Sequence, residues 1–281
     1  MRWQGHSCRS VRARLGLGGV AVVGRLYGDR TVVLSDEDIR LGLEQFAETD
    51  ATAQEIPLLQ EIAHRACGDA RIVALMRQVQ RGQPWPLLLL GAARYVRLRE
   101  VCGDRSCCEA MLREAVCDFD DYEAFRQVCL THADEIALMI RTRRVQTNEV
   151  GRTAVLFAAL GYIIKDFCAN RHLCWLDVGA SAGLSTLVGE YRFSLGRLYQ
   201  DERNGGVGVS CQTAIGGHEE AKDWGRPMVG MALGIDVGPL NVCDEDAARW
   251  LLSLVPWCME SRVRTLCECI LEARQRTVVV L

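Results

Sequence analysis

The sequence predicts an α/β protein with an all-helical N-terminal half and a C-terminal half built on a parallel β-sheet. Across residues 35–141, apolar side chains recur at helical spacing and show no convincing alternation. From residue 149 onward, short apolar runs alternate with helical stretches, a pattern typical of parallel strands joined by crossovers. The clearest run, residues 173–178, leads through a group of small residues into another helical pattern.

Length and composition are those of an ordinary soluble globular protein. The chain has 281 residues, of which 49% are hydrophobic and 25% are charged. A formal net charge of −3 gives no strong signal for nucleic-acid binding. The longest apolar run, residues 154–164, is shorter than the roughly 20 residues that span a bilayer, so we expect no membrane association.

Fourteen cysteines are scattered along the chain, and the sequence has no recognisable secretory signal. This pattern predicts reduced thiols and a cytoplasmic location. One cluster, Cys102, Cys107, Cys108 and Cys117, lacks both a C-x-x-C pair and a neighbouring histidine. Small buried side chains are therefore favoured over a zinc site, and we expect no metal site.

The first residues differ in composition from the rest of the chain. Residues 1–28 contain five arginines and no acidic residue, together with several glycines. We expect a disordered extension over residues 1–34. The alternative is an organelle-targeting segment, because transit peptides are also rich in arginine and poor in acids.

A helical domain is predicted over residues 35–148. Ser35 precedes three acidic residues, which is typical of a capped helix N-terminus. Further helices are expected at about 55–67, at 70–80, from Pro84 to about Leu98, and at 121–141. The last has a continuous apolar stripe, which predicts that it packs in the core.

A second domain is predicted over residues 149–281, and its first strand leads into a corner of small residues. The run Leu173–Asp177 is followed by Gly179, Ala180, Ser181, Ala182 and Gly183, and then by apolar residues at helical spacing. The pattern predicts a strand, a tight turn and a helix N-terminus. Small residues let a backbone approach a ligand closely, and helix-start amides favour polar or anionic groups, so we expect a ligand-binding corner.

Two interpretations of this corner fit it poorly. A dinucleotide fingerprint would need glycine at positions 181 and 184, where the chain has Ser181 and Leu184. The segment 179–183 also matches G-x-S-x-G, the nucleophile elbow of α/β-hydrolases, with Ser181 exposed on a strained turn. Such a serine hydrolase would have to use His218, the only later histidine, with an acid close to it in sequence.

The third interpretation includes the acid before the turn. The pattern Asp177-x-Gly179-x-x-x-Gly183 resembles motif I of class I S-adenosylmethionine-dependent methyltransferases, with Ser181 in place of the middle glycine. This resemblance implies a Rossmann-like domain that binds S-adenosylmethionine through Asp177, Gly179, Ala180, Ser181 and Gly183. An acid at the strand end suits the ammonium group of this cofactor.

A second motif follows the next predicted strand, residues 229–235. Gly234-Ile235-Asp236 resembles the second motif of the same methyltransferases, and this implies that Asp236 accepts hydrogen bonds from the ribose hydroxyls. Asp236 lies much farther from Gly179 than the about 20 residues of an uninterrupted βαβ unit. We therefore predict an inserted hairpin at about 191–224, in which apolar residues alternate.

Longer blocks resemble one family. Residues 143–152 (RRVQTNEVGR), 234–242 (GIDVGPLNV) and 246–251 (DAARWL) are similar to landmarks of domain-of-unknown-function family 2332, an uncharacterised and largely bacterial family. The similarity covers about residues 40–280. It implies a helical N-terminal half on a methyltransferase-like Rossmann half, and no established reaction.

The first of these blocks also carries candidate contacts. Arg144, Gln146, Asn148 and Glu149 lie just before the helix that leads to the first strand. One interpretation is helix capping and solvated arginines. The other, which the family resemblance favours, is that this polar turn contacts cofactor or substrate.

The last residues, 277–281, predict a third strand buried on both faces of the sheet. The resembled family continues with further strands, so we expect an incomplete Rossmann-like sheet, truncated after the third strand. The resulting hypothesis is a methyltransferase-like protein that binds S-adenosylmethionine, a small-molecule cofactor. Neither its substrate nor a catalytic residue is indicated. The alternatives are a serine hydrolase that uses Ser181 and a non-catalytic Rossmann-like binding or interaction protein.

Overall fold

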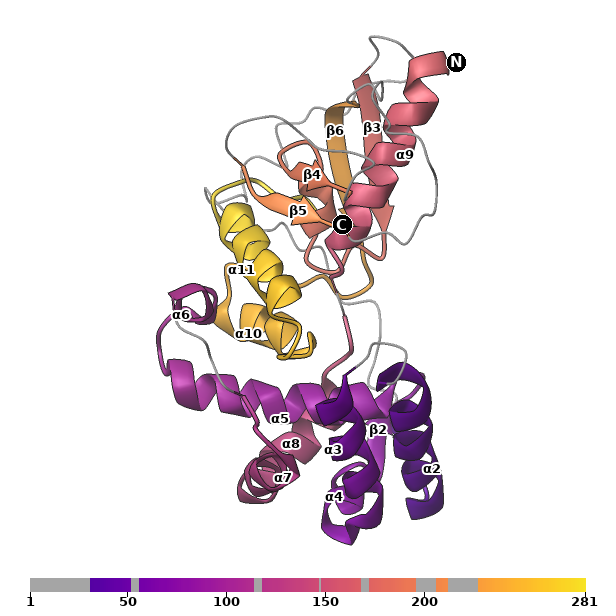
Figure 1. The fold of residues 1–281 in the computed structure, drawn as a ribbon, viewed down its shortest axis with the longest axis vertical. Coiled ribbons are helices and arrows are strands. Elements are labelled where there is room, and N and C mark those ends of the chain that lie inside the picture. The colour runs from indigo at the N-terminus through magenta and orange to yellow at the C-terminus, as the bar shows by residue number, and fades with distance from the viewer. Residues whose placement is uncertain are drawn as a thin grey trace. The chain divides into compact units, whose positions relative to one another are not determined.

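The computed structural model describes residues 31–51, 56–113, 118–146, 148–167, 172–195, 206–211 and 227–281. These residues form two compact units, which we describe separately (Figure 1). The helical unit contains the described residues up to 146, together with Glu245–Cys267. The sheet unit contains Asn148–Asp244 and Glu268–Leu281. The protein is therefore a mixed α/β protein with small parallel sheets, as the sequence predicts at the level of fold class.

The helical unit confirms the helical character predicted for the N-terminal half. Its helices are α2 (Asp36–Phe46), α3 (Pro57–Gly68), α4 (Ala70–Leu75), α5 (Trp85–Cys102), α6 (Cys107–Arg113), α7 (Tyr122–Thr131), α8 (Ala133–Thr142), α10 (Glu245–Ser253) and the first part of α11 (Glu260–Arg274), with a π-helical turn, η1, at Ala47–Ala51. None of the helices in the described part of the chain has the length and apolar character needed to cross a membrane.

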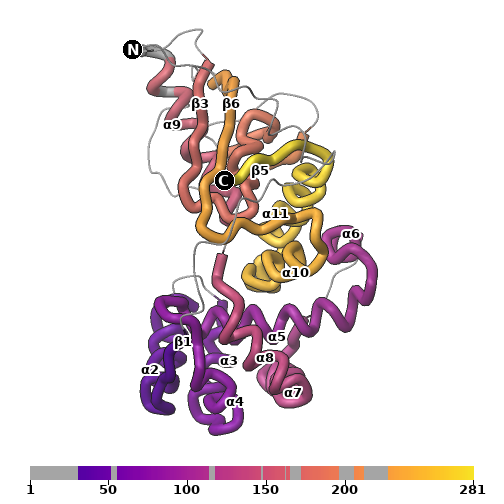
Figure 2. The backbone as a smooth tube through the Cα atoms, turned by 180° about the vertical axis from the view of Figure 1, so that it is seen from behind, coloured from indigo at the N-terminus to yellow at the C-terminus, as the bar shows by residue number. Residues whose placement is uncertain are grey.

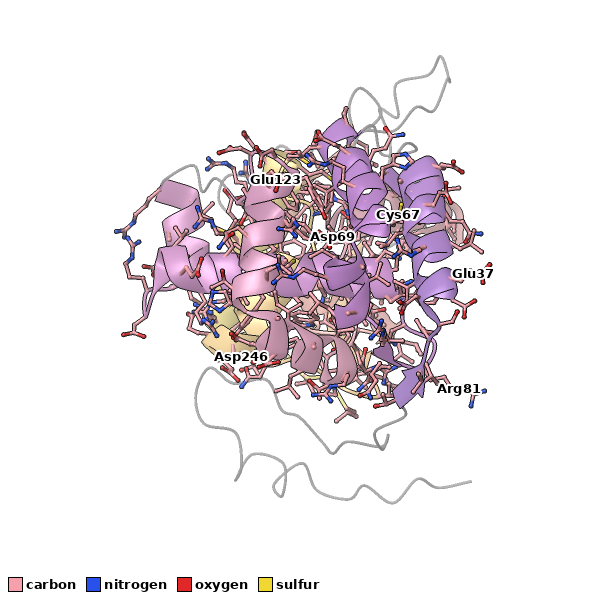
Figure 3. All side chains as sticks on the ribbon, turned by 90° about the horizontal axis from the view of Figure 1, so that it is seen from below. Glu37, Cys67, Asp69, Arg81, Glu123 and Asp246 are labelled. Atoms are coloured by element: carbon pink, nitrogen blue, oxygen red, sulfur yellow. The ribbon has the colours of Figure 1, made fainter. Side chains whose placement is uncertain are left out.

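Side-chain caps start several of these helices, as local sequence predicts. Ser35 Oγ accepts a hydrogen bond from the backbone amide of Asp38 at 3.1 Å, which confirms the predicted start of α2. Asp69, which is labelled in Figure 3, caps α4 in the same way. Its Oδ2 atom also accepts hydrogen bonds from Tyr122 Oη at 3.1 Å and Arg126 Nε at 2.5 Å. One carboxylate therefore joins the start of α4 to α7.

Two helical predictions in this unit are wrong in detail. The helix predicted over 70–80 ends at Leu75, and strand β2 (Gln78–Gln80) pairs antiparallel with β1 (Thr31–Val33), inside the segment assigned to an N-terminal extension. A single buried residue, Val79, gives this strand too little alternation to be predicted. The helix predicted over 121–141 breaks at His132, which leaves the helical conformation. The Nε2 atom of His132 lies 2.9 Å from Glu100 Oε1, which accepts a hydrogen bond.

A buried ion pair fastens α5 inside the helical unit. Arg94 Nε lies 2.9 Å from Asp118 Oδ2, and the two side chains are 1% and 0% exposed. Arg94 also donates to the carbonyl oxygens of Leu252, at 2.7 Å, and Val255. Burial raises the pKa of the Asp118 carboxyl, and the neighbouring Arg94 guanidinium opposes that shift. Helix α5 is thus bonded to the last turn of α10 and to the residues that follow it.

The sheet unit begins with α9 (Gly151–Phe167), which leads to strand β3 (His172–Val178). Strand β6 (Met228–Ile235) runs beside β3 and parallel to it (Figure 2). In this pairing Asp177 lies opposite Gly234. The C-terminal residues continue the sheet on the other side of β6. The Gly234 amide donates to Val279 O, and the Asp236 amide donates to Leu281 O, each at 2.9 Å. The chain end predicted as a third strand therefore pairs beside β6.

Two predictions for this unit need correction, and part of a third lies outside the described residues. Strands β4 (Arg192–Ser194) and β5 (Gly208–Ser210) do pair inside the predicted hairpin region, but they run parallel, so they are not the two arms of a hairpin. The helix expected after the small-residue corner is a single 3₁₀ turn, η2 (Leu184–Leu187). Residues 196–205 and 212–226 of the predicted insertion lie outside the described residues.

The sheet is also less enclosed than the sequence predicts. Val278 and Val280 are buried, whereas Leu281 is 47% exposed, so the terminal strand buries one face and not both. On β3, Leu176 and Val178 are 58% and 76% exposed for the same reason. Apolar strand residues predict burial on both faces only when both faces are covered.

Gly183 provides a test of close packing in this sheet. A Cβ atom at Gly183 would lie 2.6 Å from side-chain atoms of Val278 and Val280, and its φ of +71° adds backbone strain. Gly183→Ala is therefore expected to lower the free energy of unfolding by about 2–4 kcal/mol in urea titrations followed by circular dichroism. Gly179→Ala is the matched control, since φ is +84° and no atom lies within 4 Å of the added Cβ. Equal losses in the two variants would contradict the packing argument.

Arg94 provides a test of the buried ion pair. Arg94→Met leaves the carboxylate of Asp118 without its cation inside the helical unit and should lower the free energy of unfolding by about 3–5 kcal/mol. Arg77→Met removes the exposed partner of Asp36 and should leave the urea midpoint unchanged. The role assigned to the buried pair is wrong if both variants unfold at the same midpoint.

Candidate functional site

The two acids singled out by the sequence lie at one edge of the small parallel sheet. Asp177 is the second-to-last residue of β3 and lies opposite Gly234 of β6. Asp236 directly follows β6. Because the carboxyl ends of parallel strands meet at the same edge, residues far apart in sequence become neighbours there. Asp177 and Asp236 thus end adjacent strands.

The small-residue corner lies between these strand ends. The amides of Gly179 and Ala180 both donate to Ile235 O, at 2.7 and 3.1 Å, and the Gly183 amide donates to Ala180 O at 2.7 Å. Gly179, Ser181 and Gly183 all have positive φ angles, of 84°, 52° and 71°. A chain in this left-handed region turns sharply, and glycine adopts it without the steric strain that a Cβ atom introduces.

Asp236 holds this turn in place. Its Oδ2 atom accepts a hydrogen bond from the Ser181 amide, and its Oδ1 atom accepts one from the Gly238 amide, each at 2.8 Å. Ser181 O in turn accepts from the Leu240 amide at 3.2 Å. A carboxylate has about four lone-pair positions, so each oxygen of Asp236 can still accept another hydrogen bond.

Side chains on both sides of the turn complete the site. Ser185 Oγ donates to Asp177 Oδ2, which links the first acid to η2. Asn148 Nδ2 lies 3.4 Å from Ala180 O, so one member of the polar block reaches the corner. Glu149 O accepts from the Arg152 amide at 3.2 Å, at the start of α9.

Arg144 and Gln146 belong to the helical unit, where Arg144 O accepts a hydrogen bond from Trp250 Nε1 at 2.9 Å. Thr147 lies outside the described residues. The predicted contacts of Arg144 and Gln146 with cofactor or substrate therefore stay predictions.

The corner is open at only one of its ends. Ala180, Ser181 and Ala182 are at most 4% exposed, whereas Gly179 is exposed and has open space where its Cβ would be. The residues present fit a ligand that approaches the backbone at Gly179 beside two carboxylates. Since the amides of Gly179, Ala180, Ser181 and Gly183 already have acceptors within the protein, the ligand would meet mainly acceptors here. This differs from the sequence-based prediction, in which backbone amides of the corner are free to bind the ligand.

Sequence reasoning missed two supports of this site. Ser185 was not singled out, although a hydroxyl one turn after the corner is suitably spaced to reach the strand-end acid. Gly238 was also missed, although an acid two residues before an amide is the spacing of an Asx turn. The described residues contain no group of three or more histidine, cysteine, aspartate or glutamate side chains that could hold a metal ion.

The structure also corrects the interpretation of Ser181 as an exposed nucleophile. Its backbone has the positive φ expected of a strained turn, but the residue is only 4% exposed. His218, the histidine that a hydrolase would need, lies outside the described residues. A nucleophile that attacks an ester or amide must be reachable by its substrate.

Labelling with a fluorophosphonate probe tests this burial. The folded protein should show no modification at Ser181 by peptide mass spectrometry, because the probe cannot reach a 4%-exposed hydroxyl. The same probe applied to a serine hydrolase of known activity provides the positive control. Labelling that disappears in Ser181→Ala would contradict this expectation and favour the hydrolase.

Comparison with known proteins adds one finding. No curated protein and no solved structure shows a significant match to this chain. The family model described as an uncharacterised protein conserved in bacteria matches residues 41–281. The extent agrees with the resemblance seen in the blocks around residues 143–152 and 234–251. The chain therefore belongs to domain-of-unknown-function family 2332.

Proposed function

We propose that the sheet edge formed by Asp177, the turn at residues 179–183 and Asp236 binds S-adenosylmethionine. One observation carries this proposal. The carboxylates of Asp177 and Asp236 lie at the ends of adjacent parallel strands, beside Gly179, where an added Cβ would meet none of the described atoms. The order of β3, β6 and the C-terminal strand also agrees with one half of a Rossmann-like sheet.

The charges of this edge suit a cationic nucleoside better than a pyrophosphate. S-adenosylmethionine carries an ammonium group and a sulfonium group, both of which a carboxylate attracts. Asp177 is half-buried beside Ser185, so it is positioned before a ligand arrives. A dinucleotide would bring anionic phosphates toward the same two acids and lose the helix-start amides that usually bind them.

Asp236 would have two tasks in this proposal. It holds the turn through the amides of Ser181 and Gly238, and the remaining lone pairs of its oxygens can accept from the two ribose hydroxyls. A bent backbone at Gly179 leaves room for the ribose and amino-acid portion, since none of the described atoms lies within 4 Å of a Cβ built there.

When bound, the cofactor supplies an electrophilic methyl group. Transfer of this group relies mainly on holding a nucleophile in line with it, so positioning contributes more than acid–base chemistry. The proposal therefore assigns binding and orientation to the residues of this edge. It leaves the identity of the methyl acceptor open.

Isothermal titration calorimetry with S-adenosylmethionine and with its demethylated product tests the proposal. Both should bind the full chain, and Asp177→Asn should weaken binding roughly tenfold or more, because a charge-assisted hydrogen bond contributes about 1.5–3 kcal/mol. Glu190→Gln is the matched control. It makes the same carboxylate-to-amide change in the sheet unit, at an exposed residue that pairs with Arg276, and should bind like the unchanged chain.

Two further variants separate binding from folding. Gly179→Val places a branched side chain in the open space and should abolish binding, while Asp236→Asn should reduce it and also loosen the turn. Circular dichroism and urea midpoints identify any loss that comes from unfolding. Absence of binding heat for both ligands with the folded, unchanged protein would overturn the proposal.

A further inference from the structure

A second chemically distinctive cluster lies in the helical unit. It contains Cys102 at the end of α5, Cys107 at the start of α6 and Arg249 in α10. All three residues are buried, with exposed fractions of 2%, 0% and 8%. A buried guanidinium is unfavourable without a negative partner. The group that balances the charge of Arg249 beside these two thiols therefore has to be identified.

The hydrogen bonds indicate which atom balances Arg249. Its Nε atom donates to Cys107 Sγ at 3.3 Å, and its Nη2 atom donates to the carbonyl oxygen of Gly103 at 3.4 Å. Cys102 is the other hydrogen-bond partner of Cys107. Cys107 Sγ therefore accepts a hydrogen bond from a cation, and a cation beside a sulfur favours the thiolate.

The nearby carboxylate of Asp246 attracts Arg249 electrostatically, and it accepts hydrogen bonds from other groups. Asp246 Oδ1 accepts from Arg143 Nη2 at 2.7 Å and from the Tyr95 hydroxyl. The guanidinium of Arg249 lies 5.5 Å from the centre of the Tyr95 ring, which adds a cation–π contact.

The surroundings shift the pKa values of the two thiols in opposite directions. The hydrogen bond from Cys102, and then the contact with Arg249, hold the pKa of Cys107 below its ordinary value, although desolvation and the charge of Glu245 oppose this. The hydrogen bond to Cys107, and then burial, raise the pKa of Cys102. The contact with Arg249 thus favours the thiolate at Cys107.

We propose that Cys102 and Cys107 form an oxidisable thiol pair, in which Cys107 is the thiolate that attacks hydroperoxides and Cys102 is the thiol that closes a disulfide. The Cys107 thiolate attacks the O–O bond, takes up one oxygen as a sulfenic acid and, with one proton, releases an alcohol or water. The Cys102 thiolate, formed by loss of its proton, then displaces hydroxide from that sulfur, and water leaves. The peroxide gains the two electrons that the two sulfurs lose.

Access to the buried pair is provided by the short connection between α5 and α6. Gly103, Asp104 and Arg105 are exposed, and Gly103 has a φ of +58°, which only glycine adopts readily. A local opening of this connection would expose the sulfurs to a small oxidant. Disulfide formation would remove the negative charge beside Arg249, so oxidation would weaken the contact of α6 with α10.

Peptide mapping of the full chain tests the proposal. The reduced protein is treated with stoichiometric hydrogen peroxide at pH 7, unfolded, alkylated and digested with trypsin, which separates the two cysteines by cleaving after Arg105. A linked pair of peptides, lighter by two hydrogen atoms than their sum, is the expected product. Cys107→Ser should abolish it, while Cys108→Ser, the matched change at the next buried cysteine, should leave it intact.

Cys129 provides an internal comparison in the unchanged protein. Its thiol is fully buried in α7, and burial, together with the charge of Asp69, raises its pKa. Cys129 should remain reduced under conditions that oxidise Cys107. Comparable oxidation of the two residues, or disulfides spread at random over the cysteines, would overturn the proposal.

The role of Arg249 is tested by rate. Arg249→Met should slow formation of the linked peptides by about tenfold or more, because an ordinary cysteine is only a few per cent thiolate at pH 7. Arg249→Lys keeps a cation and should restore most of the rate. If Arg249→Met does not fold, the comparison of Cys107 with Cys129 still decides the question, and a folded Arg249→Met that reacts at the unchanged rate refutes the assignment.

Discussion

The candidate site depends above all on the carboxylate of Asp236. Its two oxygens accept the amides of Ser181 and Gly238, and in this way one side chain fixes the corner after β3 against the chain that leaves β6. An unpaired amide inside this turn would be unfavourable by about 1–3 kcal/mol, so the carboxylate stabilises a conformation that the strained φ of Ser181 alone would not favour. Ligand binding at this edge would use a residue that already has a structural role.

Close packing imposes the second constraint. Gly234 and Gly183 both face Val280, and a Cβ at either position would meet side-chain atoms at 3.1 Å or less. These glycines therefore permit the terminal strand to lie against the corner. Gly179 differs, because its Cβ would enter open space. The three glycines therefore have different roles. Gly183 and Gly234 are needed for close packing, whereas Gly179 leaves space that a ligand can occupy.

The helical unit contains two buried arginines with different counter-charges. Arg94 is balanced by the carboxylate of Asp118 and by backbone carbonyl oxygens, which is an arrangement without obvious chemistry. Arg249 donates a hydrogen bond to the sulfur of Cys107, which we propose to be a thiolate and a nucleophile. The same electrostatic requirement, that a buried guanidinium needs a negative partner, yields a structural anchor at Arg94 and, in our proposal, a reactive group at Arg249.

The sequence by itself determined the features that depend on neighbouring residues: the Ser35 cap, the helical character of the N-terminal half, the strand before the corner and the acid-ended strand at residues 228–235. Tertiary structure decided the break at His132, the parallel pairing of β4 with β5, the burial of Ser181 and the use of Asp236 to hold the turn. Each of these needs contacts between segments far apart in the chain. Periodicity and capping report only on residues within a few positions of one another, so such contacts leave no local pattern in the sequence.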